Sequence, residues 1–204
     1  MSHRDGLTGT LLGTALGDAL GLPAEGMSAK SIGRRFGKVE RFHLLGRVGF
    51  VSDDTEQAAL IAQSLARFPE DLDRCVRAFR GSLLGWFARL PWGVGRATIL
   101  ASGRIALGLK ITGVNSAGNG AAMRAAIVGA FFHDRPSERV RFGRALAEVT
   151  HRDIRAVEGA LYVAEMAAAC VAATQETSRQ SIQIQARKVV TDDRLAGAID
   201  TNPV

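Results

Sequence analysis

The feature that most constrains this fold is a long helical repeat of apolar residues near the N-terminus. The repeat stops at Gly21-Leu22-Pro23, where proline disfavours continuation of a helix, and its positions are Leu7, Leu11, Leu12, Ala15, Leu16, Ala19 and Leu20. Three glycines share one ridge of this helix, so we expect a neighbouring backbone to pack closely against Gly13, Gly17 and Gly21. Asp18 lies in the same stretch and argues against a membrane-dimer interpretation of the glycine spacing.

The same periodicity recurs along the chain and predicts an all-α fold. β-branched residues rarely alternate with polar ones, and no hairpin signature separates two such runs. Residues 26–51 lack sustained periodicity and predict a long loop with one short helix near Ser28 to Phe36. The other predicted helices run over residues 55–66, 72–88, 96–108, 121–132, 138–149, 154–173 and 179–190, with a last turn around 194–199.

Length and composition favour one domain over residues 1–204. The 204 residues are 47% hydrophobic, which is enough for one buried core. No run approaches the roughly 18 apolar residues that span a bilayer, and the N-terminus lacks the pattern of a signal peptide. We therefore expect no membrane association and a cytoplasmic location. Cys75 and Cys170 lie in apolar helical patterns, and we interpret both as reduced core residues.

The net charge of +6 raises the question of a nucleic-acid partner. The excess comes from arginines scattered over many predicted helices and not from one block, so a solvated basic surface is the better interpretation. A basic surface also attracts an anionic ligand such as a diphosphate. A basic helical protein that binds nucleic acid remains the third hypothesis, which the charge distribution disfavours.

Ser52-Asp53-Asp54-Thr55 presents oxygen-bearing side chains at a predicted helix start. Hard divalent cations prefer such ligands. The same residues also fit a helix cap, because Asp53 and Glu56 have the spacing of a capping box and acids near a helix N-terminus are favoured by its dipole. On local sequence the cap is the better interpretation, although two adjacent acids repel each other and a cap needs only one, which adds some weight to the metal interpretation.

Three further segments carry candidate binding groups, each with a structural alternative. The glycine-rich run Gly118–Arg124 enters a helix and can offer backbone N–H groups to an anion, or form a flexible turn capped by Asn119. In Thr150–Asp153 a histidine, His151, can donate to a ligand, although a lone histidine is more often structural. Glu25 follows Pro23 and can reach a cleft as an acid or base, or be merely exposed.

Taken together and in order, these segments resemble the motifs of the ADP-ribosylglycohydrolase family, which includes the dinitrogenase reductase-activating glycohydrolases. Residues 13–25, GTALGDALGLPAE, look like the opening helix of the family, and Ser52–Thr55 looks like its first metal motif. Asn119–Arg124 and Thr150–Asp153 are similar to two later motifs. The four motifs fall within residues 7–170.

The resemblance implies a compact orthogonal multi-helix bundle with a binuclear Mg²⁺ or Mn²⁺ cleft. It implies that Ser52, Asp53 and Asp54 are metal ligands, and that Glu25 and Asp54 are catalytic. The ADP-ribose site would be lined by Gly118, Asn119, Gly120, Met123 and His151. The substrate would be an ADP-ribosylated protein or a small molecule that contains ADP-ribose, and neither the acceptor nor the oligomeric state follows from the sequence.

The chain departs from the family pattern in two places. Family members carry a second metal motif, Gly-Gly-Asp-x-Asp-Thr, and this sequence reaches Val204 without it. We interpret Asp192-Asp193 as a helix cap and expect the C-terminal part of the family domain to be absent and the second metal site to be incomplete. Gly93 stands where arginine-directed bacterial members carry an aspartate.

Two expectations of function follow from this pattern. The first is a metal-dependent hydrolase that removes ADP-ribose from a modified side chain or a small acceptor. The alternative is a non-catalytic protein that binds ADP-ribose through the same cleft.

Overall fold

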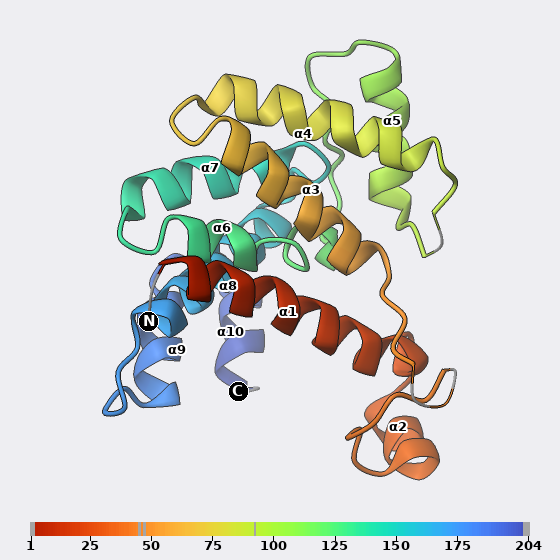
Figure 1. Ribbon diagram of the computed structural model, residues 1–204, viewed down its shortest axis with the longest axis vertical. Helices are drawn as coiled ribbons and strands as arrows, with labels where there is room; N and C mark the ends of the chain where they lie inside the picture. The colour runs from red at the N-terminus through yellow and green to blue at the C-terminus, as the bar shows by residue number, and fades with distance from the viewer. Residues whose placement is uncertain (1–2, 45, 47, 92, 202–204) are drawn as a thin grey trace.

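The structure, a computed structural model, describes residues 3–44, 46, 48–91 and 93–201. These residues form ten α-helices and two 3-10 turns (Figure 1): α1 His3–Gly21, η1 Leu22–Ala24, α2 Ala29–Phe36, α3 Asp53–Arg67, α4 Leu72–Phe87, α5 Arg96–Ala106, η2 Asn119–Ala121, α6 Ala126–Phe131, α7 Pro136–Glu148, α8 Ile154–Ala172, α9 Arg179–Arg187 and α10 Asp193–Thr201. A parallel β-bridge joins Val114 and His151, and no strand is assigned among the described residues. The prediction of an all-α fold is confirmed.

The helices are arranged around α8, which packs against α6, α7 and α9. α1 packs on α3 and α6, and α3 packs on α4. In Figure 1, α5 and α10 run across the direction of α1 and α4, and α2 protrudes beyond the end of α1. The main core lies between α3, α4, α6 and α7 and includes Ile61, Leu65, Phe79, Leu83, Trp86, Ile127, Phe132, Phe142 and Leu146. Burying such side chains contributes about 1.5–3 kcal/mol each to folding.

The start of α3 differs from the predicted cap. Asp53 was expected to cap the helix together with Glu56, but the N-cap is Ser52, whose Oγ accepts a hydrogen bond from Asp54 N at 3.4 Å. Glu56 instead accepts a hydrogen bond from Trp86 Nε1 at 2.6 Å. Asp53 is therefore the first helical residue, and its carboxylate is free of a capping role.

The glycine ridge of α1 is also not where a helix packs. A Cβ atom at Gly13, Gly17 or Gly21 would meet nothing within 4 Å in the described part of the chain, whereas one at Gly6 would lie 3.0 Å from Val171 Cγ1. The expected close approach along Gly13, Gly17 and Gly21 is therefore wrong, because α3 and α6 pack on other sides of α1.

Two smaller expectations need correction. The helix predicted over 121–132 is divided into η2 and α6, so the glycine-rich segment is a tight turn and not a helix start. Cys75 is buried as expected, but Cys170 is exposed. None of the described helices has the length and apolar character needed to cross a membrane.

Candidate active site

The first turn of α3 is held in place by Asp18 of α1. The Asp18 carboxylate accepts four hydrogen bonds, from Ser52 N at 2.7 Å, Ser52 Oγ at 2.8 Å, Thr55 N at 3.2 Å and Thr55 Oγ1 at 2.6 Å. These bonds satisfy backbone N–H groups that a helix N-terminus leaves without an intrahelical partner. Asp18 thus acts as a second cap from another helix and leaves Asp53 and Asp54 free for other contacts.

The carboxylates of Asp53 and Asp54 are crowded together at this helix end. Burial raises the pKa of Asp53 to about 6, with further contributions from Asp54 and Glu25. The pKa of Asp54 is raised by burial and then by Asp18 and Glu25. Carboxylates that raise one another's pKa in this way are stabilised by a bound cation.

A buried polar chain connects Asp53 to the glycine-rich loop. Gln57 Nε2 donates to Asp53 Oδ2 at 3.1 Å, and Arg124 Nη1 donates to Gln57 Oε1 at 2.7 Å. The same Arg124 nitrogen donates to Gly120 O at 2.6 Å. Gln57 is fully buried and Arg124 is 1% exposed, so these bonds are shielded from water. One guanidinium therefore ties the acidic motif to the loop that was predicted to bind ADP-ribose.

His151 lies against the same loop. Its Nδ1 is 2.8 Å from Thr150 Oγ1, and a Cβ atom at Gly120 would stand only 2.8 Å from its Cε1. At Gly118 a Cβ atom would lie 3.5 Å from His151 Nε2. Burial and the nearby charge of Arg124 lower the pKa of His151 to about 4, so the ring is neutral at pH 7. The glycines thus leave room for the imidazole edge beneath the loop.

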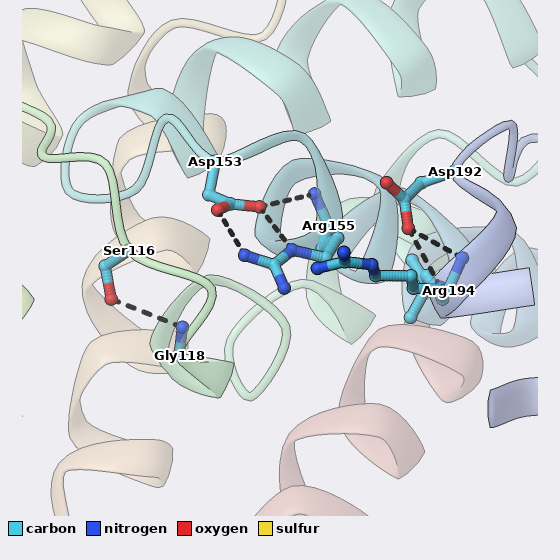
Figure 2. A network of polar contacts seen from close by, with 7 residues as sticks. Ser116, Gly118, Asp153, Arg155, Asp192 and Arg194 are labelled. Atoms are coloured by element: carbon cyan, nitrogen blue, oxygen red, sulfur yellow. Dashed lines mark hydrogen bonds and ion pairs between the residues drawn. The ribbon is translucent and has the colours of Figure 1, made fainter.

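Figure 2 shows the loop at Gly118, the start of α8 with Asp153 and Arg155, and the start of α10 with Asp192 and Arg194. Gly118 N donates to Ser116 Oγ at 3.3 Å. Asp153 caps α8 by accepting from Arg155 N at 3.0 Å, and its carboxylate also binds the Arg155 guanidinium at 2.7 and 2.9 Å. Asp153 is therefore the N-cap of α8, and the Thr150 hydroxyl contacts His151. Asp192 caps α10 as predicted.

One cavity brings the predicted catalytic and loop residues together. It has a volume of about 380 Å³ and is lined by Gly17, Asp18, Gly21, Leu22, Ala24, Glu25, Ile32, Ser52, Asp54 and Asn119. Its walls come from α1, the turn that follows it, α2, α3 and the glycine-rich loop. The glycine side of α1 therefore opens onto this cavity.

A larger cavity of about 720 Å³ adjoins the first, since both are lined by Leu22, Glu25 and Ser52. Its other walls include Trp86 and Arg89. Glu25 stands at the junction, exposed to both spaces.

Gly93 lines the larger cavity and lies next to the acidic motif. It has a φ of +82°, a conformation that favours glycine, and a Cβ atom there would lie 3.4 Å from Asp53 Oδ1. A side chain at this position would therefore point at Asp53. Trp92, next to Gly93, lies outside the described residues.

The structure gathers most of the predicted residues but divides them into two groups. Ser52, Asp54, Glu25 and Asn119 share one cavity, and Gly118 and Gly120 pack on His151. Met123 takes part in the loop through its N–H, which donates to Asn119 O at 3.0 Å.

Sequence reasoning missed the groups that hold the site together: Asp18, Gln57, Arg124 and Thr150. Of these four, only Asp18 could have been suspected from the sequence, because it is a carboxylate among apolar and glycine residues. In the described ranges no three carboxylate, histidine or cysteine side chains converge closely enough to hold a metal ion by themselves.

Comparisons with known proteins show which proteins this chain is similar to. The sequence model described as ADP-ribosylglycohydrolase matches residues 1–202. An uncharacterized protein of Archaeoglobus fulgidus is 34% identical over 171 residues, covering 78% of this chain and 53% of the relative. The chain thus spans about half the length of that protein. A solved structure named "ADP-ribosylglycohydrolase-related protein complex" superposes with a TM-score of 0.73 at 25% identity, covering 97% of this chain and 67% of the other.

Proposed function

Because the chain belongs to the ADP-ribosylglycohydrolase family, we propose that it hydrolyses the glycosidic bond between ADP-ribose and a modified side chain or small acceptor, with Mg²⁺ or Mn²⁺ as cofactor. The substrate in this proposal is an ADP-ribosylated protein or a small molecule that contains ADP-ribose. The observation that carries it is the cavity shared by Glu25, Asp54 and Asn119. These residues lie far apart in the sequence. The fold brings them together, so that two carboxylates lie beside a glycine-rich loop.

The donor set at the start of α3 suits a hard divalent cation. Asp53 Oδ2 accepts a hydrogen bond from Gln57 Nε2, and the carboxylate keeps further lone pairs for a cation. Ser52 and Thr55 use their hydroxyl protons on Asp18, which leaves lone pairs on both oxygens. Mg²⁺ is commonly bound through one or two carboxylates and several waters, so Asp53 and Asp54 with Ser52 fit such an ion.

The chemistry divides among the residues of the cavity. A cation bound there would supply Lewis-acid polarisation of ribose oxygens and of the attacking water. Asp54 stabilises the positive charge that develops at the anomeric carbon as the glycosidic bond breaks. Glu25 accepts a proton from the water whose oxygen bonds to that carbon, and this proton passes to the departing nitrogen or oxygen of the acceptor. The Gly118–Gly120 turn and His151 bind the ADP-ribose portion.

Binding of ADP-ribose without hydrolysis is the second candidate. It is favoured by the small number of carboxylates that converge among the described residues, and by Gly93, which offers no acidic side chain beside Asp53. In this case the same cavity and loop would hold the ligand, and no bond would break.

One experiment separates the two candidates. The purified chain is incubated with ADP-ribosyl-arginine and ADP-ribosyl-serine peptides, with Mg²⁺, with Mn²⁺ or with EDTA, and released ADP-ribose is measured by mass spectrometry. We expect release that depends on the metal and falls at least a hundredfold in Asp54→Asn, a typical loss for a catalytic acid or base.

A matched control is Asp71→Asn, an acid-to-amide change at the cap of α4, where Asp71 accepts from Arg74 N at 2.9 Å. It should leave release unchanged. No release by the unmodified chain, with calorimetric binding of ADP-ribose, would favour the second candidate. No release and no binding would overturn both.

A further inference from the structure

Arg124 fixes the hydrogen-bond roles of its neighbours because a guanidinium only donates. Its Nη2 donates to Thr150 Oγ1 at 2.5 Å, so one lone pair of that hydroxyl is occupied. Arg124 is 1% exposed and lies 5.2 Å from the centroid of the Phe79 ring, so no water competes for this contact. The Thr150 hydroxyl must therefore donate its own proton to another acceptor.

His151 Nδ1, at 2.8 Å, is the one acceptor that the described contacts give this proton. Thr150 is fully buried, and a buried hydroxyl proton without an acceptor is costly. If Nδ1 carried a proton instead, that proton would have to share the hydroxyl oxygen with Arg124, and the hydroxyl proton would have no partner. Satisfying the Thr150 hydroxyl, with Arg124 as its donor and Nδ1 as its acceptor, places the imidazole proton on Nε2.

The ring is also held from its backbone side. Val114 N donates to Thr150 O at 3.0 Å, and Arg152 N donates to Val114 O at 2.8 Å, so the residues on both sides of His151 are anchored. The Nε2 edge then faces the loop, where a Cβ atom at Gly118 would lie 3.5 Å away and one at Gly120 would lie 3.3 Å away. Burial and Arg124 keep the pKa of the ring low, which is consistent with a single proton.

We propose that Arg124 and Thr150 are positioning residues that lock His151 as the neutral Nε2–H tautomer, so that it offers a hydrogen-bond donor to an acceptor oxygen of the ligand at the Gly118–Gly120 turn. The lock itself is a property of the chain without ligand. The identity of the ligand, ADP-ribose, rests on the proposed function. A ligand oxygen at this place is a ribose hydroxyl or a phosphate oxygen, since both accept from an N–H group.

The lock is tested by nuclear magnetic resonance on the full chain with ¹⁵N-labelled histidine at pH 7. His151→Gln assigns the ring signals among the four histidines. In the unmodified chain we expect a proton on Nε2 and an Nδ1 resonance characteristic of a hydrogen-bonded acceptor. Thr150→Val should move the Nδ1 resonance to that of an unbonded nitrogen or give a mixture of tautomers, and Thr150→Ser should restore the original signal.

Ligand binding is measured on the same variants by titration with free ADP-ribose. Loss of one well-placed hydrogen bond corresponds to about tenfold weaker binding in Thr150→Val, with Thr150→Ser close to the unmodified chain. A purely structural role of Thr150 would lower stability without moving the Nδ1 resonance.

The outcomes are distinct. A proton on Nδ1, or on both nitrogens, in the unmodified chain would overturn the lock, and this measurement needs no variant to fold. If the unmodified chain has the expected tautomer but Thr150→Val binds ADP-ribose with the same affinity, the lock has no part in binding. The expected tautomer together with no affinity for ADP-ribose in any variant would contradict the proposed function, but not the lock.

Discussion

Thr55 Oγ1 donates to Asp18 Oδ2 at 2.6 Å, which joins the second half of α1 to the first turn of α3. Together with the three other bonds to this carboxylate, it fixes the position from which Asp53 and Asp54 project.

Replacing Asp18 with alanine should therefore destabilise the protein. Hydrogen bonds to a charged group contribute about 1.5–3 kcal/mol, so we expect Asp18→Ala to lower the free energy of unfolding by about 2–3 kcal/mol. Asp18→Asn, which keeps one acceptor oxygen, should lose less. Urea unfolding followed by circular dichroism measures both. The control is Asp73→Ala at an exposed position of α4, and equal effects at Asp18 and Asp73 would refute the role of the Asp18 cap.

Replacing Asp53 with asparagine should stabilise the metal-free protein. The pKa of Asp53 is raised to about 6. At pH 7.5 the carboxyl is still ionised, but its charge costs more free energy in the folded state than in the unfolded state. Removing that charge keeps an acceptor for Gln57 and should raise the free energy of unfolding by about 1–3 kcal/mol in EDTA. The unmodified chain should gain stability on adding Mg²⁺, and Asp53→Asn should not. A decrease in the melting temperature of Asp53→Asn in EDTA would contradict this prediction.

The pH dependence of stability should carry a signature of His151. Its folded pKa, about 4, lies below the value of 6.5 for an unperturbed histidine, so below pH 6.5 the unfolded chain takes up a proton that the folded chain does not. Stability from this group is present above pH 6.5 and is lost towards pH 4, by about 1–2 kcal/mol at pH 5.

Asp53 acts in the opposite direction, because a raised carboxyl pKa makes the folded state gain stability as the pH falls below about 6. The effect of His151 is obtained by subtracting the pH dependence of a variant without this histidine from that of the unmodified chain. Unfolding free energies in EDTA at pH 7 and pH 5 are compared for the unmodified chain and for His151→Gln, which does not titrate. The unmodified chain should lose more stability than the variant, and an equal loss in both would show that His151 is not held neutral.

Alanine at Gly120 should disturb the ligand loop. Its Cβ atom would stand 2.8 Å from His151 Cε1, so either the ring or the loop must shift. We expect a loss of about 1–3 kcal/mol in stability, as for an overpacked site, and at least tenfold weaker binding of ADP-ribose by calorimetry. Gly13→Ala is the matched control, because a Cβ atom there meets nothing within 4 Å and alanine favours a helix interior by about 1 kcal/mol. Unchanged binding in Gly120→Ala would mean that the ligand does not use this turn.

Local periodicity predicted most of the helices, since their apolar positions repeat within each segment, but it did not show that residues 121–132 are divided into η2 and α6. Ser52, Asp53 and Asp54 could be identified because neighbouring residues in sequence stay together at a helix start. The bonds of Asp18 to Ser52 cross 34 residues, and no local pattern reports such a pairing. Arg124 was predicted only as the end of a motif, because arginine is seldom buried, and its burial depends on partners from α3 and the turn before α8. The ridge of Gly13 and Gly17 gave a misleading signal, since glycine spacing does not distinguish a helix contact from a cavity wall.

The shared guanidinium of Arg124 has a consequence for how a ligand enters. Its Nη1 donates to Gln57 on one side and to Gly120 on the other, so the acidic motif and the loop cannot separate without breaking a buried hydrogen bond to a charged group. These two parts of the site therefore keep their spacing through bonds of the chain itself, and a ligand meets a preassembled pair of walls that need not close around it.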